Sequence, residues 1–299
     1  MPPLKTNTKI LASEFEYLEC PTLAEALNCL SKYNGKAKIL AGGTDLLIKM
    51  KSGLLQCQYL IFVKKIEALN YLISDKKTLR IGPMISLRSI EKNEQVKAYY
   101  SALFEAVRSM AATSVKNMAT IGGNLCNGSP AADTAPPLLV YGATLKLSSI
   151  RGDRIVPVEE FFVGPSQTVL ESDELLTEIC LPDLGDQIGS SFLKLGRVSA
   201  DIAKINVAVC LNRTGKSVGN CRIAFGSVAP TPIRIPEAEE ILKGQEMSDE
   251  LIVKAAKAAA GLIKPITDKR STNSYRQQVS KVILEEGIRS AWQRAGGEL

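Results

Sequence analysis

The first clear periodicity of apolar and polar positions along the chain begins after Pro21. Apolar residues recur there at spacings of three and four, which places them on one face of a helix. They are Leu23, Ala26, Leu27 and Leu30. Thr22 is a favourable N-cap residue, Glu25 is placed to reach back to the cap amide, and Gly35 is placed to end the helix.

Short apolar runs follow this helix and predict strands. Residues 37–41 read as a short buried strand that leads directly into two glycines, and residues 59–63 predict a second strand after a turn near Gly53. Residues 1–67 therefore predict a small α/β unit.

The pattern changes in the next segment, where alternation replaces the helical period. Residues 71–73 and 78–82 predict a hairpin with its turn at 75–77, and Ser86 is placed to cap a helix that begins at Leu87. A longer helix is predicted from residue 100 to about residue 115 because Leu103, Val107 and Met110 share one face. Further strands are predicted at residues 144–147, 154–158 and 175–181.

Residues 120–133 form the least helix-like stretch of the chain. The stretch holds three glycines, two asparagines, two hydroxyl side chains and a proline. This composition permits positive φ angles and exposes backbone N–H groups. We therefore predict a loop with free amides here.

After a boundary near residues 182–186 the remaining chain predicts strands first and helices last. The strands are predicted at residues 191–195, 205–211 and 218–227, with a turn at 214–216, and the helices at 251–263 and 280–292. This order is typical of an α+β domain.

Composition narrows the class of protein. With 299 residues, of which 45% are hydrophobic, the chain suits roughly two domains of about 150 residues. The net charge of +6 comes from basic residues scattered singly, which argues against nucleic-acid binding. No stretch approaches the ~20 apolar residues of a membrane span, and the start of the chain lacks the apolar core of a signal peptide. We expect a cytoplasmic protein.

The sequence contains no histidine. This excludes Ser-His-Asp and Cys-His catalysis, zinc or haem held by histidine, and a flavin attached through a histidyl bond. The cysteines are dispersed and form no Cys-x-x-Cys pair, so they read as reduced thiols and predict no metal site. They are Cys20, Cys29, Cys57, Cys126, Cys180, Cys210 and Cys221.

Two glycine-rich loops are the candidates for function. Gly42, Gly43 and Thr44 follow a predicted strand, where adjacent amides and a hydroxyl can cradle a pyrophosphate. An ordinary tight turn explains the same residues. Neither this loop nor residues 120–133 matches the Walker A or the Gly-x-Gly-x-x-Gly pattern, so the usual nucleotide-binding folds are not indicated. The pairing of two such loops favours a dinucleotide held from two sides.

These loops resemble a known family. The sequence AGGTDL at residues 41–46, and TIGGN at 120–124 followed by SPAAD at 129–133, closely resemble the two FAD signatures of the flavoprotein (medium) subunit of molybdenum hydroxylases. This is the family of the xanthine dehydrogenase and carbon monoxide dehydrogenase FAD subunits. FLKLGR at 192–197 and DIAK at 201–204 resemble the entry into that family's C-terminal domain, so the resemblance covers nearly the whole chain.

The resemblance implies a set of FAD-binding residues. The first signature would wrap the FAD pyrophosphate, and the second would run beneath the flavin and the pyrophosphate from the other side. The implied residues are Ile39, Leu40, Ala41, Gly42, Gly43, Thr44, Asp45, Leu46, Thr120, Ile121, Gly122, Gly123 and Asn124.

Four residues outside the two signatures also match family positions. Asn127 and Asp133 match positions that hold the cofactor, and Leu176 matches one that packs on the ring system. Lys194 matches a position near the isoalloxazine, where a cation would stabilise the anionic reduced flavin. A solvated strand lysine explains Lys194 equally well. For Asp45 and Asp201, capping of a turn or helix is the stronger explanation.

The resemblance also implies the fold. Residues 1–185 would form an α+β, two-subdomain FAD-binding fold of the vanillyl-alcohol oxidase type, with subdomains at about 1–67 and 68–185. Residues 186–299 would form a small α+β C-terminal domain with an antiparallel sheet plus helices. FAD would be bound non-covalently because histidine is absent, and Cys126 is the one loop thiol that merits attention.

The implied function is electron transfer in an oxidoreductase complex. A molybdopterin-binding large subunit would hydroxylate the substrate, and a [2Fe–2S] small subunit would pass electrons to FAD on this chain. NAD⁺ or another acceptor would then receive them, so no catalytic residue or metal ligand is predicted here. The 4-hydroxybenzoyl-CoA reductase branch is disfavoured because no cysteines cluster. A self-contained flavin-dependent oxidase and a non-catalytic scaffold that has lost FAD are the alternatives.

Overall fold

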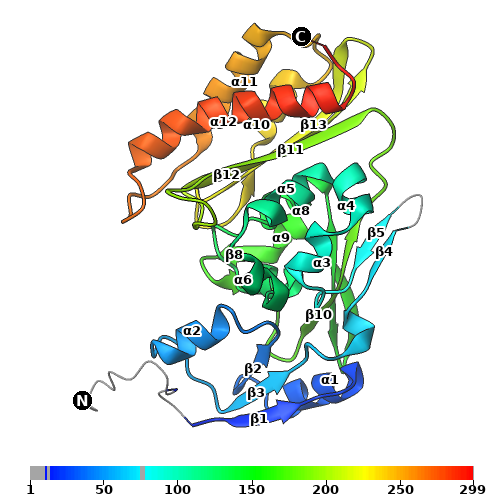
Figure 1. Ribbon diagram of the computed structural model, residues 1–299, viewed down its shortest axis with the longest axis vertical. Coiled ribbons are helices and arrows are strands. Elements are labelled where there is room, and N and C mark those ends of the chain that lie inside the picture. The colour runs from blue at the N-terminus through cyan, green and yellow to red at the C-terminus, as the bar shows by residue number, and fades with distance from the viewer. Residues whose placement is uncertain (1–10, 12–13, 75–77, 299) are drawn as a thin grey trace.

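Three larger sheets follow one another along the long axis of the molecule (Figure 1). The computed structural model describes residues 11, 14–74 and 78–298. An N-terminal sheet lies at one end, a five-stranded sheet with its helices lies in the middle, and a four-stranded sheet with the last helices lies at the other end. The two predicted glycine loops lie where the first two units meet.

The N-terminal unit is the small α/β unit that the sequence predicted, and the structure shows that its strands are parallel. Its strands are ordered β1 (Glu16–Glu19), β3 (Tyr59–Phe62) and β2 (Ala37–Leu40). Its helices are α1 (Leu23–Lys32) and α2 (Leu46–Lys51), and α2 was not predicted. The parallel order follows from the helical crossover between strands.

Two local predictions for this unit need correction. Thr22 caps α1 by accepting from the Glu25 amide, but the Glu25 carboxylate accepts from the Thr22 hydroxyl at 3.0 Å and does not reach the cap amide. In β2 only Ala37 is buried, so β2 is not the buried strand that its apolar run predicted. Ile39 lines a cavity instead.

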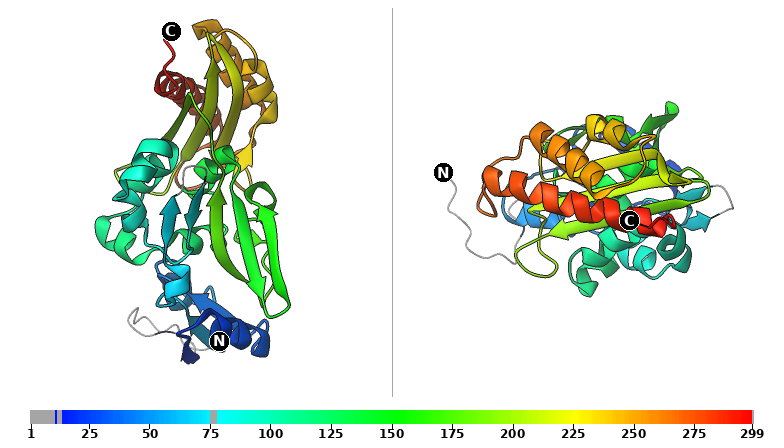
Figure 2. Two further views of the ribbon diagram at one scale, coloured as in Figure 1. Left: turned by 90° about the vertical axis from the view of Figure 1, so that its right-hand side faces the viewer. Right: turned by 90° about the horizontal axis from the view of Figure 1, so that it is seen from above.

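The middle unit is an antiparallel sheet covered on one side by short helices (Figure 2). Its strand order is β4 (Leu72–Ser74), β5 (Leu79–Ile81), β10 (Leu175–Leu181), β6 (Thr144–Ser149) and β7 (Gly152–Pro157). The pairing of β4 with β5 confirms the predicted hairpin, whose turn at 75–77 lies outside the described residues.

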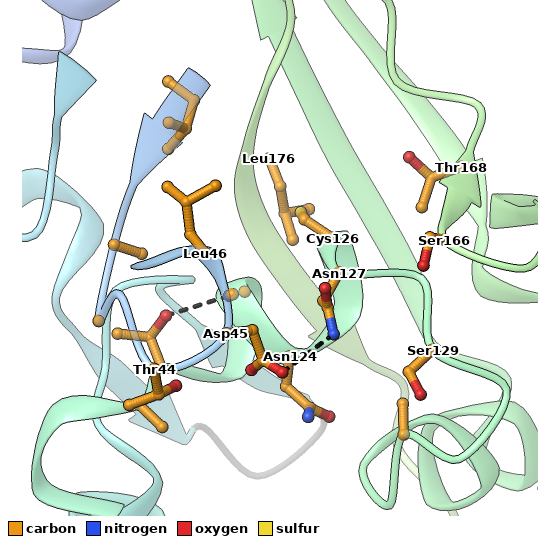
Figure 3. A pocket seen from close by; sticks show the side chains of 18 of the residues that line it. Thr44, Asp45, Leu46, Asn124, Cys126, Asn127, Ser129, Ser166, Thr168 and Leu176 are labelled. Atoms are coloured by element: carbon orange, nitrogen blue, oxygen red, sulfur yellow. Dashed lines mark hydrogen bonds between the residues drawn. The ribbon is translucent and has the colours of Figure 1, made fainter. Parts of the chain in front are cut away.

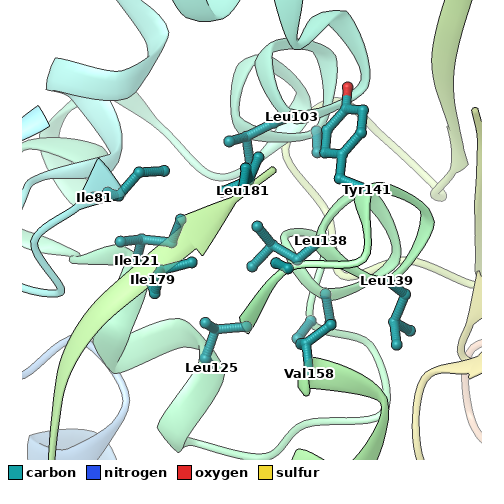
Figure 4. Packing of buried hydrophobic residues seen from close by; sticks show 14 of the residues in the cluster. Ile81, Leu103, Ile121, Leu125, Leu138, Leu139, Tyr141, Val158, Ile179 and Leu181 are labelled. Atoms are coloured by element: carbon teal, nitrogen blue, oxygen red, sulfur yellow. The ribbon is translucent and has the colours of Figure 1, made fainter. Parts of the chain in front are cut away.

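Most helices of this unit bury apolar side chains in the core that includes β5 and β10 (Figure 4). The helices are η1 (Glu67–Leu69), α3 (Leu87–Glu91), α4 (Glu94–Tyr99), α5 (Ser101–Ser109), α6 (Thr113–Met118), α7 (Ile121–Cys126), α8 (Ala135–Tyr141) and α9 (Val158–Phe161). A small hairpin of β8 (Phe162–Gly164) and β9 (Gln167–Thr168) follows. Ser86 caps α3 as predicted.

The single helix predicted from residue 100 to about residue 115 is wrong, because the chain breaks into α5 and α6. Met110 is extended, and Ala111 has a positive φ of 37°. The buried Lys116 ammonium donates to the carbonyls of Val107 and Arg108 at the end of α5 and pairs with Glu91. Lys116 thus provides the hydrogen-bond donors for the free carbonyls at the end of α5, and the chain changes direction there. The break places Met110 and Ala111 in the cavity wall.

The loop predicted throughout residues 120–133 is also partly wrong, because its first half forms α7. Thr120 caps this helix by accepting from the Gly123 amide. Ile121 and Leu125, four residues apart, are both fully buried. Their burial in the core outweighs the poor helix propensity of two adjacent glycines.

The C-terminal unit is an antiparallel sheet with helices on one face, which confirms the predicted order of strands before helices. Its strands are β11 (Ile188–Leu195), β12 (Ile205–Thr214), β13 (Ser217–Gly226) and β14 (Ile233–Arg234), and its helices are α10 (Pro236–Leu242), α11 (Asp249–Leu262) and α12 (Asn273–Arg294). The second face of the sheet packs on α5 and α8 of the middle unit. Of the described helices, none has the length and apolar character needed to cross a membrane.

Candidate functional site

A cavity of about 860 Å³ lies where the three units meet. The loop after β2, the start of α7, the segment 129–133, the β8–β9 hairpin, β10 and the end of β11 all contribute to its wall. Figure 3 shows Thr44 and Asp45 on one side, Ser166 and Thr168 on the other, and Asn127 between them. The volume lies in the upper range of small-molecule and cofactor sites.

The structure brings nearly all of the predicted FAD-binding residues together around this cavity. The lining residues among them are Ile39, Ala41, Gly42, Gly43, Thr44, Asp45, Leu46, Thr120, Gly122, Gly123, Asn124, Asn127, Asp133, Leu176 and Lys194. Leu40 and Ile121 are not part of the lining. Ile121 is buried in the core and its amide donates to the Ile85 carbonyl.

The loop after β2 presents free backbone donors. Within the described part of the chain, the amides of Gly42, Gly43 and Thr44 donate to no other group. Gly43 has a φ of 73°, which glycine adopts without strain. Successive amides left free in such a turn form an anion-binding concavity. The free amides are consistent with the pyrophosphate cradle that the first loop predicted.

Gly42 also allows this loop to touch the end of α6. A Cβ added at Gly42 would lie 2.1 Å from the Met118 carbonyl oxygen and 2.9 Å from the Ala119 Cα. Both neighbours are backbone atoms and cannot rotate away. The absence of a side chain at Gly42 therefore sets how closely the two loops approach each other.

The first turn of the second loop does not present the free amides that the composition of the loop predicted. Its first-turn amides are occupied, since Gly122 donates to the Pro83 carbonyl and Gly123 to the Thr120 hydroxyl. Its contribution to the cavity is a bare glycine surface and several polar side chains, those of Thr120, Asn124, Asn127, Ser129 and Asp133. Asn124 accepts from the Thr134 hydroxyl at 2.6 Å.

Side chains tie the two loops together across the cavity. The Asn127 amide donates to Asp45 at 3.3 Å and accepts from the Lys49 ammonium at 2.6 Å. Asp45 makes no side-chain cap bond to α2, so capping does not explain it. Lys49 was missed by the sequence prediction. It lies one helical turn after Asp45, and that spacing was the signal that would have identified it.

Lys194 is not a solvated strand lysine. Its side chain is 8% exposed and donates to the Asp133 carboxylate at 2.6 Å. Burial raises the pKa of Asp133, while Lys194 and a hydrogen bond from Asn206 oppose that rise. The cavity wall therefore contains a buried ion pair.

Asp201 lines the same end of the cavity but has structural partners. Its carboxylate accepts from the Arg197 amide and pairs with the Arg197 guanidinium at 2.7 Å. These bonds hold the pKa of Asp201 well below its usual range. The capping explanation given by the sequence is therefore supported for Asp201.

The Cys126 side chain is exposed to the cavity near Leu176 (Figure 3). Desolvation by the neighbouring cavity walls raises the pKa of its thiol to about 12. A protonated thiol is a poor nucleophile. The hairpin residues Ser166, Gln167 and Thr168 add polar groups on the opposite wall, and no sequence signal pointed to them.

This arrangement is suited to holding a large anionic cofactor. It offers one amide cradle for a diphosphate, apolar walls at Leu46, Leu175 and Leu176, and a buried cation at Lys194. No group of three or more metal-ligating side chains occurs in the described ranges. The fold and site define a cofactor-binding protein that holds a dinucleotide.

Comparison with known proteins identifies the class. Residues 13–184 match the model of the FAD binding domain in molybdopterin dehydrogenase, and residues 190–291 match that of the CO dehydrogenase flavoprotein C-terminal domain. The chain is 31% identical to the xanthine dehydrogenase FAD-binding subunit of Escherichia coli O157:H7, over 95% of this chain and 98% of that subunit. It is 32% identical to the glyceraldehyde dehydrogenase medium chain of Sulfolobus acidocaldarius, over 92% of this chain and 98% of that one.

Solved structures agree with this result. A chain of carbon monoxide dehydrogenase from Hydrogenophaga pseudoflava superposes with a TM-score of 0.92 at 32% identity, covering 95% of this chain and 99% of that chain. A chain of quinoline 2-oxidoreductase from Pseudomonas putida 86 gives a TM-score of 0.89 at 25% identity, covering 95% and 98%.

The protein is thus an FAD-binding oxidoreductase subunit. It belongs to the family of FAD-binding medium subunits of xanthine and carbon monoxide dehydrogenases.

Proposed function

We propose that this chain is the electron-transfer subunit of a molybdopterin-dependent hydroxylase or dehydrogenase complex. Electrons would reach its FAD from a [2Fe–2S] small subunit, and NAD⁺ or another acceptor would receive them. A molybdopterin-binding large subunit would carry out the substrate chemistry. The observation that carries the proposal is the cradle of free amides at residues 42–44, which faces a cavity of about 860 Å³ in a chain of this family.

Different residues of the cavity would bind different parts of FAD. We assign the diphosphate to the amides of Gly42, Gly43 and Thr44, and the ring system to the wall around Leu176 and Lys194. FAD supplies the redox chemistry when bound. The chain contributes position, exclusion of water and a fixed charge. The high pKa of Cys126 supports non-covalent binding.

The domain limits follow the same proposal. We place the FAD-binding domain at residues 1–185, with subdomains at about 1–67 and 68–185, and the C-terminal domain at 186–299. The segment between β10 and β11 contains no helix or strand, which suits a boundary there.

The role of the second loop can be tested with Gly123→Val. Gly123 lines the cavity, and a Cβ there would lie 2.9 Å from the Thr120 hydroxyl and 3.8 Å from the Ala41 Cβ, so a valine would crowd the space between the two loops. Overpacking of this kind costs about 1–3 kcal/mol, so we expect FAD affinity to fall by roughly 10- to 100-fold. The measurement is the visible spectrum of the purified chain and of the supernatant after acid precipitation.

Gly261→Val is a matched control for this change. Gly261 is an exposed helical glycine with nothing within 4 Å of an added Cβ. The control should release as much FAD as the native chain. Full flavin occupancy in Gly123→Val would contradict the loop assignment.

The proposed electron-transfer function makes a separate prediction. The isolated chain loaded with FAD should be reduced by NADH or by a reduced [2Fe–2S] protein in an anaerobic absorbance assay. It should not oxidise organic substrates such as xanthine or glyceraldehyde unless large and small subunits are added. Turnover of such a substrate by the isolated chain would favour a self-contained flavin oxidase.

A further inference from the structure

A row of three residues crosses the C-terminal sheet beside the cavity. Lys194 on β11 is the direct cross-strand partner of Asn206 on β12, and Asn206 is the partner of Gly226 on β13. Directly opposed residues lie on the same face of a sheet, with their Cβ atoms about 5 Å apart. Lys194 and Asn206 therefore point to the same side, toward the segment that carries Asp133.

The two side chains meet on one carboxylate. The Asp133 carboxylate accepts from Lys194 Nζ at 2.6 Å through Oδ2 and from Asn206 Nδ2 at 2.7 Å through Oδ1. Lys194 and Asp133 line the cavity, whereas Asn206 is fully buried behind them and does not. Each carboxylate oxygen thus has one donor, so the carboxylate is held in a single orientation.

Gly226 provides the space that Asn206 occupies. A Cβ added at Gly226 would lie 2.3 Å from Asn206 Oδ1. Any other residue at this position would displace the asparagine amide. The hydrogen bond between Asn206 and Asp133 therefore requires a glycine at position 226.

Stability alone does not account for Asn206. Its Oδ1 atom is buried and has no hydrogen-bond partner in the described structure. A buried acceptor without a partner is destabilising, and an apolar side chain of similar shape would avoid that cost. The interaction that only the asparagine can make is the hydrogen bond from its Nδ2 to Asp133.

We infer that Asn206 is a positioning residue for the cofactor site, acting through Asp133 to hold the Lys194 ammonium at the cavity wall. This inference rests on the proposed function, since the cation matters only if the cavity holds FAD. With both donors in place, the negative charge of Asp133 is shared between Lys194 and Asn206. Without Asn206, that charge is balanced less completely, and the reduced flavin gains less from the cation.

The test is the midpoint potential of bound FAD in Asn206→Leu. We expect a more negative potential than in the native chain, together with FAD binding weakened by about tenfold, because a hydrogen bond to a charged group is lost. Gly226→Ala should shift the potential in the same direction by displacing the amide. In an Asp133→Asn background, Asn206→Leu should cause no further shift, because the residue acts through that carboxylate.

Cys210→Ala is the matched control. Cys210 lies on the same face of β12, is buried, and does not line the cavity. It should lower the thermal stability without moving the potential. A native potential in Asn206→Leu, with only the stability lowered, would overturn the inference.

Two further outcomes are decisive. If Asn206→Leu does not fold, Gly226→Ala decides in its place, and an unchanged potential there overturns the inference. A shift that persists in the Asp133→Asn background also overturns it, since the effect would then bypass Asp133. FAD binding by the native chain tests the proposed function separately and needs no variant. If the native chain does not bind FAD, the proposed function itself is contradicted.

Discussion

Replacing Gly42 by alanine is expected to remove FAD from the protein while leaving most of the fold intact. The new Cβ would lie 2.1 Å from the Met118 carbonyl oxygen, so the loop after β2 must move away from α6. The free amides of Gly42, Gly43 and Thr44 would then no longer converge on one point. With a cost of about 1–3 kcal/mol or more for forced packing, FAD affinity should fall by roughly 100-fold.

The measurement is the amount of FAD retained per chain after gel filtration, followed by the dissociation constant for added FAD. Gly261→Ala is the control, because nothing lies within 4 Å of an added Cβ there. Circular dichroism of both variants reports whether the fold is kept. Native FAD affinity in Gly42→Ala would show that the close approach of the two loops does not form the site.

The largest effect on stability is expected from Lys194→Met. This change leaves the Asp133 carboxylate buried without its counter-ion, and breaking one partner of a buried pair typically costs about 3–5 kcal/mol. The double variant Lys194→Met/Asp133→Leu should recover most of that loss, because no unpaired charge remains. Urea unfolding of the FAD-free proteins measures both values.

The loss in Lys194→Met should also depend on pH. Burial already raises the pKa of Asp133, and removal of Lys194 raises it further. A carboxyl group whose folded pKa exceeds its unfolded pKa binds more protons in the folded state, so stability falls as pH rises through that interval. The deficit should therefore be larger at neutral pH than at mildly acidic pH.

Lys97→Met is the surface control for this experiment. Lys97 pairs with Glu94, but both side chains are more than half exposed. Exposed pairs contribute at most about 1 kcal/mol. Equal destabilisation by Lys194→Met and Lys97→Met would contradict a buried pair at the cavity.

The fold was predictable from sequence where local signals and burial agree. Thr22 and Ser86 cap their helices, Leu175–Leu181 forms a strand at the predicted residues, and the turn at 214–216 joins two long strands. For the caps and the turn the determining interactions lie within a few residues along the chain, and for the strand the apolar pattern agrees with its burial in the core. Nearly all of the residues that the family resemblance implied also line the cavity, although many other lining residues were not identified by it.

The errors have tertiary causes. The helix predicted from residue 100 breaks at Ala111 because Lys116 satisfies the end of α5 from outside it. The predicted glycine loop forms α7 because Ile121 and Leu125 are buried in a core built from distant strands. Lys116 is close to α5 in sequence, but its burial and its pairing with Glu91, 25 residues earlier, arise only from packing.

The sequence by itself determined the chemistry that is available: the absence of histidine, the glycine loop that frees amides at residues 42–44, and the family to which the chain belongs. Only the tertiary structure decided which groups act together. Lys194, Asp133 and Asn206 are up to 73 residues apart, yet strand register and one loop place them within hydrogen-bond distance. The charge state of such a cluster depends on burial and on partner distance, and both arise only when the units pack.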